Sequence, residues 1–412
     1  MNSPFDAESR WSRWRAALQG RRQLVMCLLT MPLVLFVVVV FLFPVARFLA
    51  LSVDNSDKAQ ALDRTAAVLI ANGSTTPDEA AYRALVEDLA QVKKAGRDGV
   101  LAQLINQRLV GSRLLILNTA NDAANGRFTG DAVKEEVLVR YPGWSNPALW
   151  QVIGTDAGRF TDHYLLASID LQRADDGSIG PVPPDQAVFI AVLARTLWIS
   201  IVVTVLCAVL SIPLAQAIAS APPAWSKLMF ALVLFPLWTS LLVRTVIWII
   251  VLQKNGPVNS SLLFLGAIDQ PLSLIYTRFS LYLAMVQVLL PMMVLSVLSV
   301  MRRIPQSYMR AALSLGAPWT VAWRRVQLPL IMPGILAGSA IVFVFALGYY
   351  ITPVLVGGPT DQMISAHVAF YINTTLNWGM AAALSVQLLM ILALGGLLFW
   401  SGRALFTRRP AP

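Results

Sequence analysis

The chain has 412 residues, of which 57% are hydrophobic and only 13% are charged, whereas soluble domains carry roughly a quarter charged residues. Several apolar runs reach the ~20 residues that a helix needs to cross ~30 Å of hydrocarbon, so the composition excludes a soluble protein and predicts a polytopic helical membrane protein. The net charge of +10 does not indicate nucleic-acid binding, because residues 54–185 hold 18 acidic and 13 basic residues and the other basic residues cluster beside the apolar runs.

The basic segments predict the orientation of the chain. The tail 1–23 is rich in arginine and carries Trp11 and Trp14, which is typical of a cytoplasmic segment anchored at the membrane surface. The loop 302–328 has five arginines and no acidic residue, and the tail 403–412 is also basic, so we expect all three in the cytoplasm. Six membrane spans agree with this orientation, and they are predicted at residues 24–50, 190–215, 228–252, 280–301, 334–356 and 381–400.

The outward segment 51–189 is too long for a simple loop, so we predict a small periplasmic α+β domain inserted after the first span. Its first half has apolar residues at helical spacing behind Thr75, Thr76 and Pro77, which are typical of a helix start. Its second half contains RLLILNTA, KEEVLVRYP and HYLLASIDLQ, which are predicted as short strands because Gly, Pro, Asn and Asp separate them. The five later spans then form a helical core over residues 190–402.

No motif predicts catalysis, a cofactor or a metal site. The sequence has no GxxxxGK[ST] and no GxGxxG after a strand, and its two histidines are too few and too far apart for zinc. We interpret His163 as a solvated or structural residue, and His367 either as an interfacial residue or as one that meets a substrate. No Asp or Glu lies in the core of a predicted span, which argues against a proton-relay carrier, so energy for transport is expected from another source.

Polar side chains inside the predicted spans are candidate functional residues. Arg244 lies about two turns from the outer end of its span, where it either lines a pathway or extends to the membrane surface. Gln287 lies in the middle of a span and needs a partner within the bundle. Arg47 and Arg195 lie near the outer boundary and are interpreted as extending to the membrane surface.

The loop 302–333 has more residues with a particular conformational role, such as glycine and proline, than a simple connector between two spans requires. Residues 307–315 predict a short helix, which Gly316 ends because glycine tolerates the left-handed conformation after a helix. Pro318 suits the first turn of a second helix, and Leu328–Pro329 is expected to break that helix before the next span. The pattern indicates a rigid cytoplasmic projection, or alternatively a helix pair lying on lipid headgroups.

This loop resembles the EAA loop of binding-protein-dependent ABC importer permeases, which has the pattern Glu-Ala-Ala, three residues, Gly, nine residues, Ile, one residue, Leu-Pro. Every interval matches, although Arg310 stands where the family has Glu. Blocks such as LVRTVIWIIVLQKNGPVNSSLL and LNWGMAAALSV make the chain from about residue 190 onward similar to the polyamine (spermidine/putrescine) branch, which also includes permeases for opines and aminoethylphosphonate. Since the family's loop docks on an ATPase subunit, the resemblance implies an ATPase-coupling role for Arg310, Ala311, Ala312, Gly316, Val326, Leu328 and Pro329.

The resemblance implies a non-catalytic permease subunit of the bacterial inner membrane, with no cofactor of its own. ATP and Mg would be used by a dimer of separate ATPase subunits, a periplasmic binding protein would deliver the solute, and a second permease subunit, identical or homologous, would complete the pathway. The large outer segment alternatively suggests a membrane-anchored sensor. An intramembrane enzyme is disfavoured because no catalytic constellation is present.

A polyamine is the predicted cargo, and an opine, aminoethylphosphonate or another small organic solute is the alternative. A flexible cation favours carboxylates and aromatic faces, whereas Arg244 favours a carboxylate or phosphonate. In the alternative interpretation the aspartates cap loops and the aromatic residues form an interfacial belt. The candidate pathway residues are Arg244, Trp248, Asp269, Gln287, Tyr349, Tyr350 and Asp361.

Overall fold

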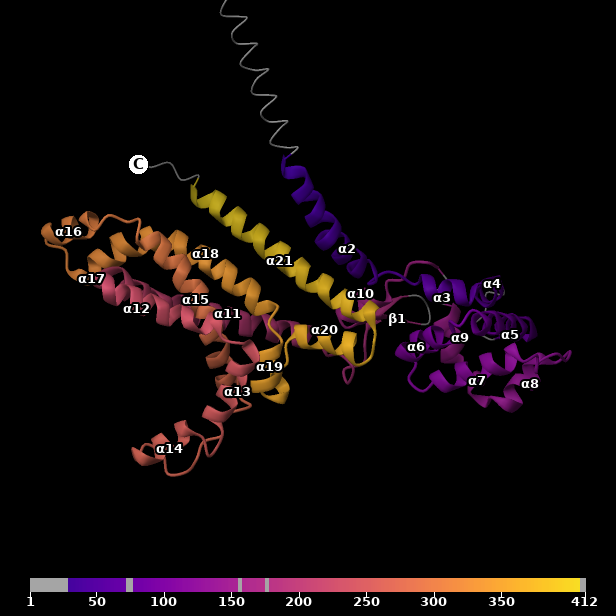
Figure 1. Ribbon diagram of the computed structural model, residues 1–412. Coiled ribbons are helices and arrows are strands. Elements are labelled where there is room, and N and C mark those ends of the chain that lie inside the picture. Colours follow the sequence, from indigo (N-terminus) through magenta and orange to yellow (C-terminus); the bar gives the residue numbers. More distant parts are fainter. Residues whose placement is uncertain (1–28, 72–76, 155–157, 175–177, 408–412) are drawn as a thin grey trace, which may run out of the picture.

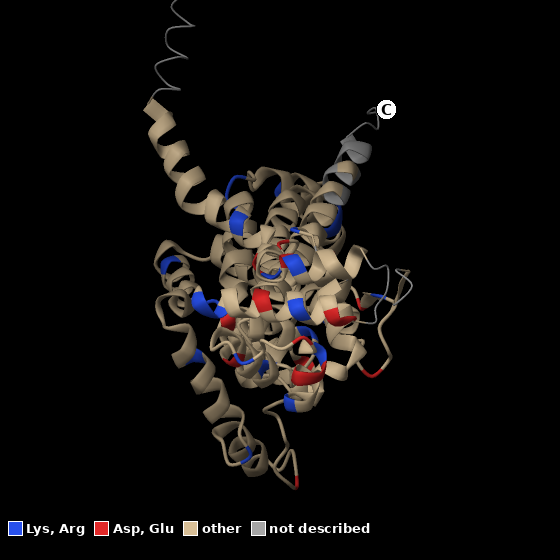
Figure 2. Cartoon of the chain, turned by 90° about the vertical axis from the view of Figure 1, so that its right-hand side faces the viewer, with Lys and Arg blue, Asp and Glu red and all other residues tan. Residues whose placement is uncertain are grey.

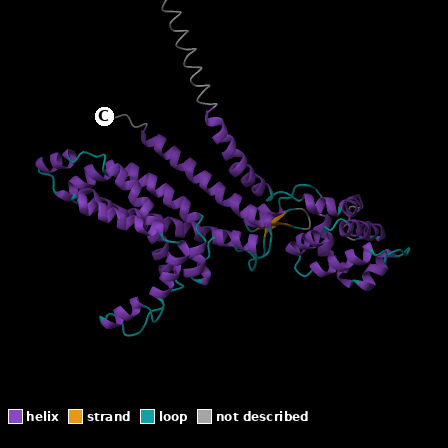
Figure 3. Ribbon diagram, viewed as in Figure 1, coloured by secondary structure: helices purple, strands orange, loops and turns teal. Residues whose placement is uncertain are grey.

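The computed structural model describes residues 29–71, 77–154, 158–174 and 178–407, so the predicted tail 1–23 and the beginning of the first span lie outside the described residues. Helices make up almost all of the described chain, and its strands are the short antiparallel pair β1 (Leu171–Arg173) and β2 (Ile179–Pro181) (Figure 3). Six helical segments are long and apolar enough to cross a membrane, which confirms the predicted all-α fold with six candidate spans. They are Leu29–Ala50, Phe189–Ser220, Leu241–Phe264, Arg278–Met301, Trp319–Leu347 and Trp378–Leu397.

The centre of the bundle is formed by α11 (Phe189–Ser220), α15 (Arg278–Met301) and α18 (Leu328–Leu347), which share a buried apolar core. α15 and α18 approach closely because Gly334 and Gly338, one turn apart, have no side chain between the two backbones. α21 (Trp378–Thr407) and the first span, which ends in α2 (Phe43–Ala50), lie outside this centre (Figure 1). No residue in the apolar window of the first span is buried against the described chain.

The third predicted span, 228–252, is wrong as a single helix. The structure has α12 (Pro223–Leu234), a 3-10 turn η3 (Phe235–Trp238) and α13 (Leu241–Leu252). Pro236 has no backbone N–H and Thr239 is extended, so the helical hydrogen bonds cannot continue through this stretch. α13 is followed by α14 (Pro257–Phe264), and the candidate span here is Leu241–Phe264.

The fifth span differs from the prediction at both ends. Leu328–Pro329 does not break the second helix of the loop: α17 (Trp319–Ala322) runs through a π-helical turn, η4 (Trp323–Gln327), directly into α18. The N–H of Leu328 reaches the carbonyl of Trp323, five residues back, and this wider turn accommodates the proline ring that follows. At its other end α18 stops at Leu347, and α19 (Ile351–Val356) is a separate short helix.

A second π-helical turn, η1 (Val38–Leu42), lies in the first span. The N–H of Phe43 reaches the carbonyl of Val38, directly before Pro44. In both helices a π-helical turn directly before a proline therefore lets the helix continue without a break.

The insertion is helical, so the predicted α+β fold is corrected. RLLILNTA lies in α7 (Arg113–Ala124), most of KEEVLVRYP lies in α8 (Val133–Arg140), and HYLLASIDLQ forms α10 (His163–Ser168) with only its end in β1. In α7 the buried positions Ile116, Thr119, Ala120 and Ala123 follow the helical period, and burial of this face outweighs the β-propensity of the isolated stretch. The remaining helices are α3 (Ser56–Ala61), α4 (Asp63–Ala71), α5 (Glu79–Lys94), α6 (Asp98–Arg108) and α9 (Pro147–Gly154).

Aromatic side chains whose polar groups are hydrogen-bonded fill the centre of the insertion. Trp144 is fully buried, and its indole N–H donates to the hydroxyl of Thr119 at 2.9 Å. Its backbone carbonyl accepts hydrogen bonds from Tyr82 and Trp150, at 3.0 and 2.7 Å. At the start of α5 the capping residue is Asp78, whose side chain accepts from the N–H of Ala81, whereas Thr75 and Thr76 lie outside the described residues.

The insertion joins the bundle through a neck, which we define as residues 53–55 and 158–161. Asp54 pairs with Phe160 as an antiparallel bridge, the N–H of Asn55 donates to the carbonyl of Arg159, and the N–H of Thr161 donates to that of Val53. The insertion lies at one end of the bundle, and α16 and α17 lie at the other end (Figure 1). Seen from the side of the insertion, acidic and basic residues are mixed over it, and the helices that extend beyond it are mostly uncharged (Figure 2).

Candidate functional site

Residues 307–322 of the predicted coupling loop form two short helices that lie exposed at the end of the bundle, and we call this helix pair the elbow. α16 (Ser307–Ser314) is followed by Gly316, whose φ of +85° is a conformation that favours glycine, and then by α17. Leu315 is 88% exposed and Trp319 is 60% exposed, and the rings of Trp319 and Trp323 stack with centroids 6.4 Å apart. Large apolar side chains left uncovered in this way are typical of a surface that meets another protein or lipid.

The seven predicted coupling residues fall into two groups. Arg310, Ala311 and Gly316 are exposed on the elbow, and Ala312 is half-buried. Val326 and Leu328 are half-buried where η4 and α18 meet the bundle, and Pro329 is exposed. The first group therefore lies on the surface of the elbow, whereas the second connects the elbow to the fifth span.

A cavity of about 490 Å³ separates α16 from the bundle. Its walls come from the ends of α11 and α15, from α16 and from η4. One wall is braced by side-chain amides: Gln327 donates to Gln216 at 3.1 Å, and Gln216 donates to the hydroxyl of Ser220 at 3.0 Å. Arg302 and Arg310 both line this cavity, and no pattern in the sequence separates Arg302 from the other four arginines of the loop.

The structure brings four of the predicted pathway residues together near the break between α18 and α19. The indole N–H of Trp248 donates to the side-chain carbonyl of Gln287 at 2.8 Å, which gives that mid-span amide its partner. Arg244 lies one turn from Trp248 on α13, and its charge interacts with the phenol of Tyr349.

The guanidinium group of Arg244 has only some of its hydrogen bonds within the described chain. Its Nη2 donates to the carbonyl of Thr239 at 3.0 Å, but its Nε and Nη1 are buried with no hydrogen-bond partner among the described residues. Two buried donors of a cation without an acceptor are costly, and the described residues supply no acceptor for them.

Of the other three predicted pathway residues, Tyr350 lies in the same break between α18 and α19, directly after Tyr349, whereas Asp269 and Asp361 lie elsewhere. Asp361 is buried and its carboxylate binds the Nε of Arg278 at 2.7 Å. Asp269 is exposed in the loop after α14, and Tyr350 is 41% exposed at the start of α19. The ion pair between Arg278 and Asp361 was missed because its residues are 83 positions apart and no spacing rule links them.

The two histidines have structural neighbours. The ring of His367 lies against Phe189, and burial together with the charge of Arg195 lowers the pKa of His367. The ring of His163 packs on Tyr164 at the start of α10. Over the described ranges, no group of three or more His, Cys, Asp or Glu side chains is placed to hold a metal ion.

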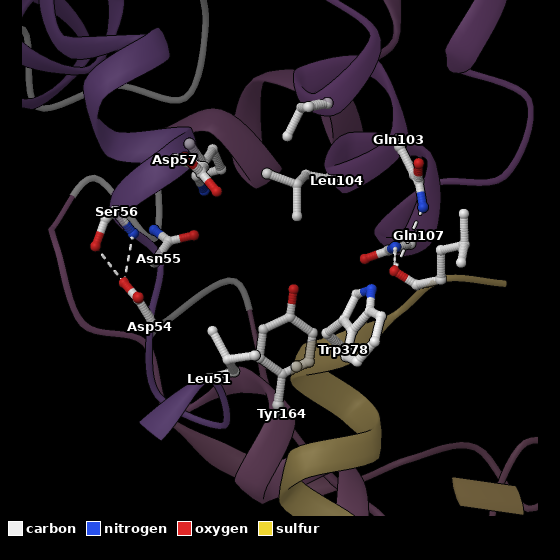
Figure 4. A pocket seen from close by; sticks show the side chains of 14 residues that line it. Leu51, Asp54, Asn55, Ser56, Asp57, Gln103, Leu104, Gln107, Tyr164 and Trp378 are labelled. Carbon is white, nitrogen blue, oxygen red and sulfur yellow. Dashed lines mark hydrogen bonds between the residues drawn. The ribbon is translucent and has the colours of Figure 1, made fainter. Parts of the chain in front are cut away.

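A second cavity, of about 350 Å³, lies where the insertion meets the spans. The hydroxyl of Tyr164 points into it, and Trp378 and Leu104 form part of its walls (Figure 4). Gln103 and Gln107 on α6 donate to the backbone carbonyls of Thr375 and Leu376, just before α21, at 3.2 and 3.4 Å. The insertion therefore rests directly on the beginning of the sixth span.

The comparison with known proteins identifies the bundle. Residues 208–410 match the family described as "Binding-protein-dependent transport system inner membrane component". The spermidine/putrescine transport system permease protein PotB of Escherichia coli (strain K12) is 30% identical over 221 residues, which cover 54% of this chain and 80% of PotB. The chain belongs to the binding-protein-dependent ABC transporter permeases.

This permease is also similar to relatives with other names. It is 32% identical to the inner membrane ABC transporter permease protein YdcU of Escherichia coli (strain K12) over 216 residues, which cover 49% of this chain and 68% of YdcU. It is 28% identical to the molybdenum transport system permease protein ModB of Mycobacterium bovis over 192 residues, covering 46% of this chain and 71% of ModB. The family match begins at residue 208, so the first span and the insertion lie outside it.

Membership of this family confirms the predicted class of protein. The permease is a non-catalytic, multi-pass inner-membrane subunit, and its family bears no cofactor. It works in a system that also contains an ATPase and a periplasmic binding protein.

Proposed function

We propose that this permease forms one part of the solute pathway of an importer and that its elbow, α16 to α17, is the joint on which the ATPase acts. The observation that carries the proposal is the unbroken helix from Trp319 to Leu347, which links the exposed elbow to the fifth span. A displacement of α17 must therefore move α18, because no flexible connection separates them.

The proposed mechanism is alternating access between two states. A dimer of ATPase subunits closes on ATP and moves the elbow, and the spans open toward a solute-loaded binding protein. The elbow and both termini then lie in the cytoplasm and the insertion 51–189 lies in the periplasm, with the permease core spanning 190–402. A second permease subunit completes the pathway, because one chain cannot enclose it alone.

A polyamine is our first proposal for the cargo, supported by the similarity to PotB. The structure adds the aromatic faces of Trp248 and Tyr349 near the break between α18 and α19. Neither predicted aspartate is placed to bind a cation there, since Asp361 is paired with Arg278 and Asp269 lies in an exposed loop. The carboxylates that a polyamine requires would then come from the second permease subunit.

A solute that carries both an amine and an oxyanion, such as an opine or aminoethylphosphonate, is the second candidate. The buried, unpartnered Nε and Nη1 of Arg244 favour it, because a carboxylate or phosphonate accepts two parallel hydrogen bonds from a guanidinium. Uptake of labelled putrescine and of labelled aminoethylphosphonate by the assembled transporter in vesicles separates the two. We expect saturable putrescine uptake. Uptake of aminoethylphosphonate alone, lost in Arg244→Gln, would replace the first candidate with the second.

Coupling is tested by Gly316→Val. A β-branched residue is strained at a φ of +85°, so the angle between α16 and α17 should change and the ATPase should no longer co-purify with the permease. Gly266→Val is the matched control, because Gly266 also has a positive φ of +66° but follows α14. Full retention of the ATPase by Gly316→Val would contradict the proposed joint.

A further inference from the structure

The cavity beneath the elbow is lined by hydrogen-bond donors. It measures about 490 Å³, which gives room for a small polar group. Besides apolar residues and the backbone of the turn after α15, its polar and charged lining consists of Gln216, Ser220, Arg302, Gln306, Tyr308, Arg310 and Gln327.

No acidic residue balances the two arginines in this cavity. From residue 186 to the end of the sequence the acids are Asp269 and Asp361, and Asp361 is paired with Arg278. Within the described part of the chain, Arg310 has no side-chain hydrogen bond or ion pair, and Arg302 only reaches Ser226 at 3.5 Å and the ring of Phe230 at 5.6 Å. The two arginines that line this cavity therefore have no acidic side chain among the described residues to balance their charge.

The position of the cavity indicates which anion is available. α11 has 32 residues and α15 has 24, so at 1.5 Å per residue they measure about 48 and 36 Å, longer than the ~30 Å hydrocarbon layer. Their ends at Ser220 and Met301, which line the cavity, therefore reach the depth of the lipid headgroups. Basic pockets between spans at this depth are suited to phosphate groups.

We propose that this cavity is a phosphate-binding site, in which Arg302 and Arg310 together hold the phosphate of a phospholipid headgroup or a soluble phosphate. A phosphate has enough oxygen acceptors for two guanidinium groups, and the amide brace from Gln327 to Gln216 fixes the opposite wall. Because Arg302 follows the end of α15 and Arg310 lies on α16, the bound phosphate sets the distance between the elbow and the bundle. Binding does not depend on the proposed function, but its effect on ATPase coupling rests on it.

Arg302→Gln tests the site in the full-length permease, and Arg303→Gln is the matched control. Arg303 is the next residue and is also exposed, but it does not line the cavity. In nanodiscs of phosphatidylcholine with phosphatidylglycerol, native mass spectrometry should show phosphatidylglycerol retained by the wild type and by Arg303→Gln. Arg302→Gln should bind it about tenfold more weakly, since a hydrogen-bonded charge is lost. Arg302→Lys should recover part of the binding, which shows that the fold is intact.

The source of the phosphate is distinguished in nanodiscs of phosphatidylcholine alone. If the lipid is the ligand, titration with inorganic phosphate should produce no binding there, and ATP hydrolysis by the assembled transporter should depend on phosphatidylglycerol. If inorganic phosphate binds in the wild type and not in Arg302→Gln, the soluble anion is the ligand. Equal binding of both probes by Arg302→Gln and Arg303→Gln would overturn the proposal. Lipid binding is measured without the ATPase, so a failure of the proposed coupling would leave this result unaffected.

Discussion

Asp122 on α7 is the residue on which the ionic contacts of the insertion converge. Tyr141 donates to its carboxylate at 2.8 Å, Arg127 approaches it at 3.1 Å, and Arg140 pairs with the same group. Burial by itself would raise the pKa of Asp122, but the hydrogen bonds from Tyr141 and Arg140 and the charge of Arg127 outweigh it, so the pKa is lowered. The ionised form is therefore the one that the fold stabilises.

Asp122→Asn is expected to lower the free energy of unfolding by about 1–3 kcal/mol at pH 7. Since the folded pKa is below the unfolded value, the contribution of Asp122 is present above that value and is lost as the pH falls through the folded pKa. The difference between wild type and variant should then begin to shrink as the pH falls below about 4, the ordinary value for an aspartate, and disappear below the folded pKa. Hydrogen exchange of α7 and α8 in the full-length permease, measured across this pH range, gives the local stability.

Asp88 on α5 supplies the control with the opposite sign. Burial raises its pKa, although the N–H and hydroxyl of Thr65 both donate to it. A raised pKa means that wild type loses stability relative to Asp88→Asn as the pH rises through the unfolded and then the folded pKa. Parallel pH curves for the Asp122 and Asp88 variants would contradict this account.

At the scale of single residues, the sequence identified candidate polar groups but not their partners. Gln287 was expected to need a partner and Trp248 was an independent candidate, yet nothing in the sequence joins them. Asp361 resembled a cation ligand because Arg278, which neutralises it, is distant along the chain. Local spacing predicted the glycine conformation at Gly316, because that conformation is decided within one turn of backbone.

Among the elements, the packing of α15 against α18 depends on the absence of two side chains. A Cβ at Gly338 would lie 2.6 Å from Sδ of Met293 and 3.0 Å from Cβ of Ser296. A Cβ at Gly334 would lie 3.0 Å from the carbonyl oxygen of Ser296. A side chain at either position would therefore require Met293 or the backbone of α15 to move.

Gly338→Leu should separate the two helices and lower the thermal stability of the permease in detergent, at a cost of about 1–3 kcal/mol for overpacking. Gly395→Leu is the matched control on α21, because a Cβ there meets no atom of the described chain within 4 Å. Equal melting temperatures for the two variants would show that the close approach is not needed.

Whether a segment is a helix or a strand was predictable where the spacing of its apolar residues and the length of the apolar run both indicate the same structure, as in α11 and α15. It was not predictable for the short apolar stretches in α7 and α8, because a buried helix and a buried strand have the same composition. The helix from α17 to α18 was missed for a different reason: a proline normally ends a helix, and the π-helical turn that prevents this has no sequence signature.

For the whole molecule, the elbow and the insertion at opposite ends of the bundle predict opposite sides of the membrane (Figure 1). Val139 on α8 is 84% exposed and Leu315 beside the elbow is 88% exposed, so each can report its side as a single cysteine. In a background with Cys27 and Cys207 replaced by serine, Val139→Cys should react with a membrane-impermeant maleimide in spheroplasts. Leu315→Cys should react only after permeabilisation, and the reverse pattern would invert the proposed orientation.

The neck has a consequence for how a gene encoding such a permease can change in length. The chain leaves the first span and returns toward α10 at backbone segments that are hydrogen-bonded to each other, so the two ends of the insertion meet at one point. A change in the length of the chain between these two segments does not require their ends to move apart, although it would alter the contacts that Gln103 and Gln107 make just before the sixth span. An in-frame deletion that joins Asp54 to Phe160 is therefore expected to leave residues 208–410, which the family match covers, in place.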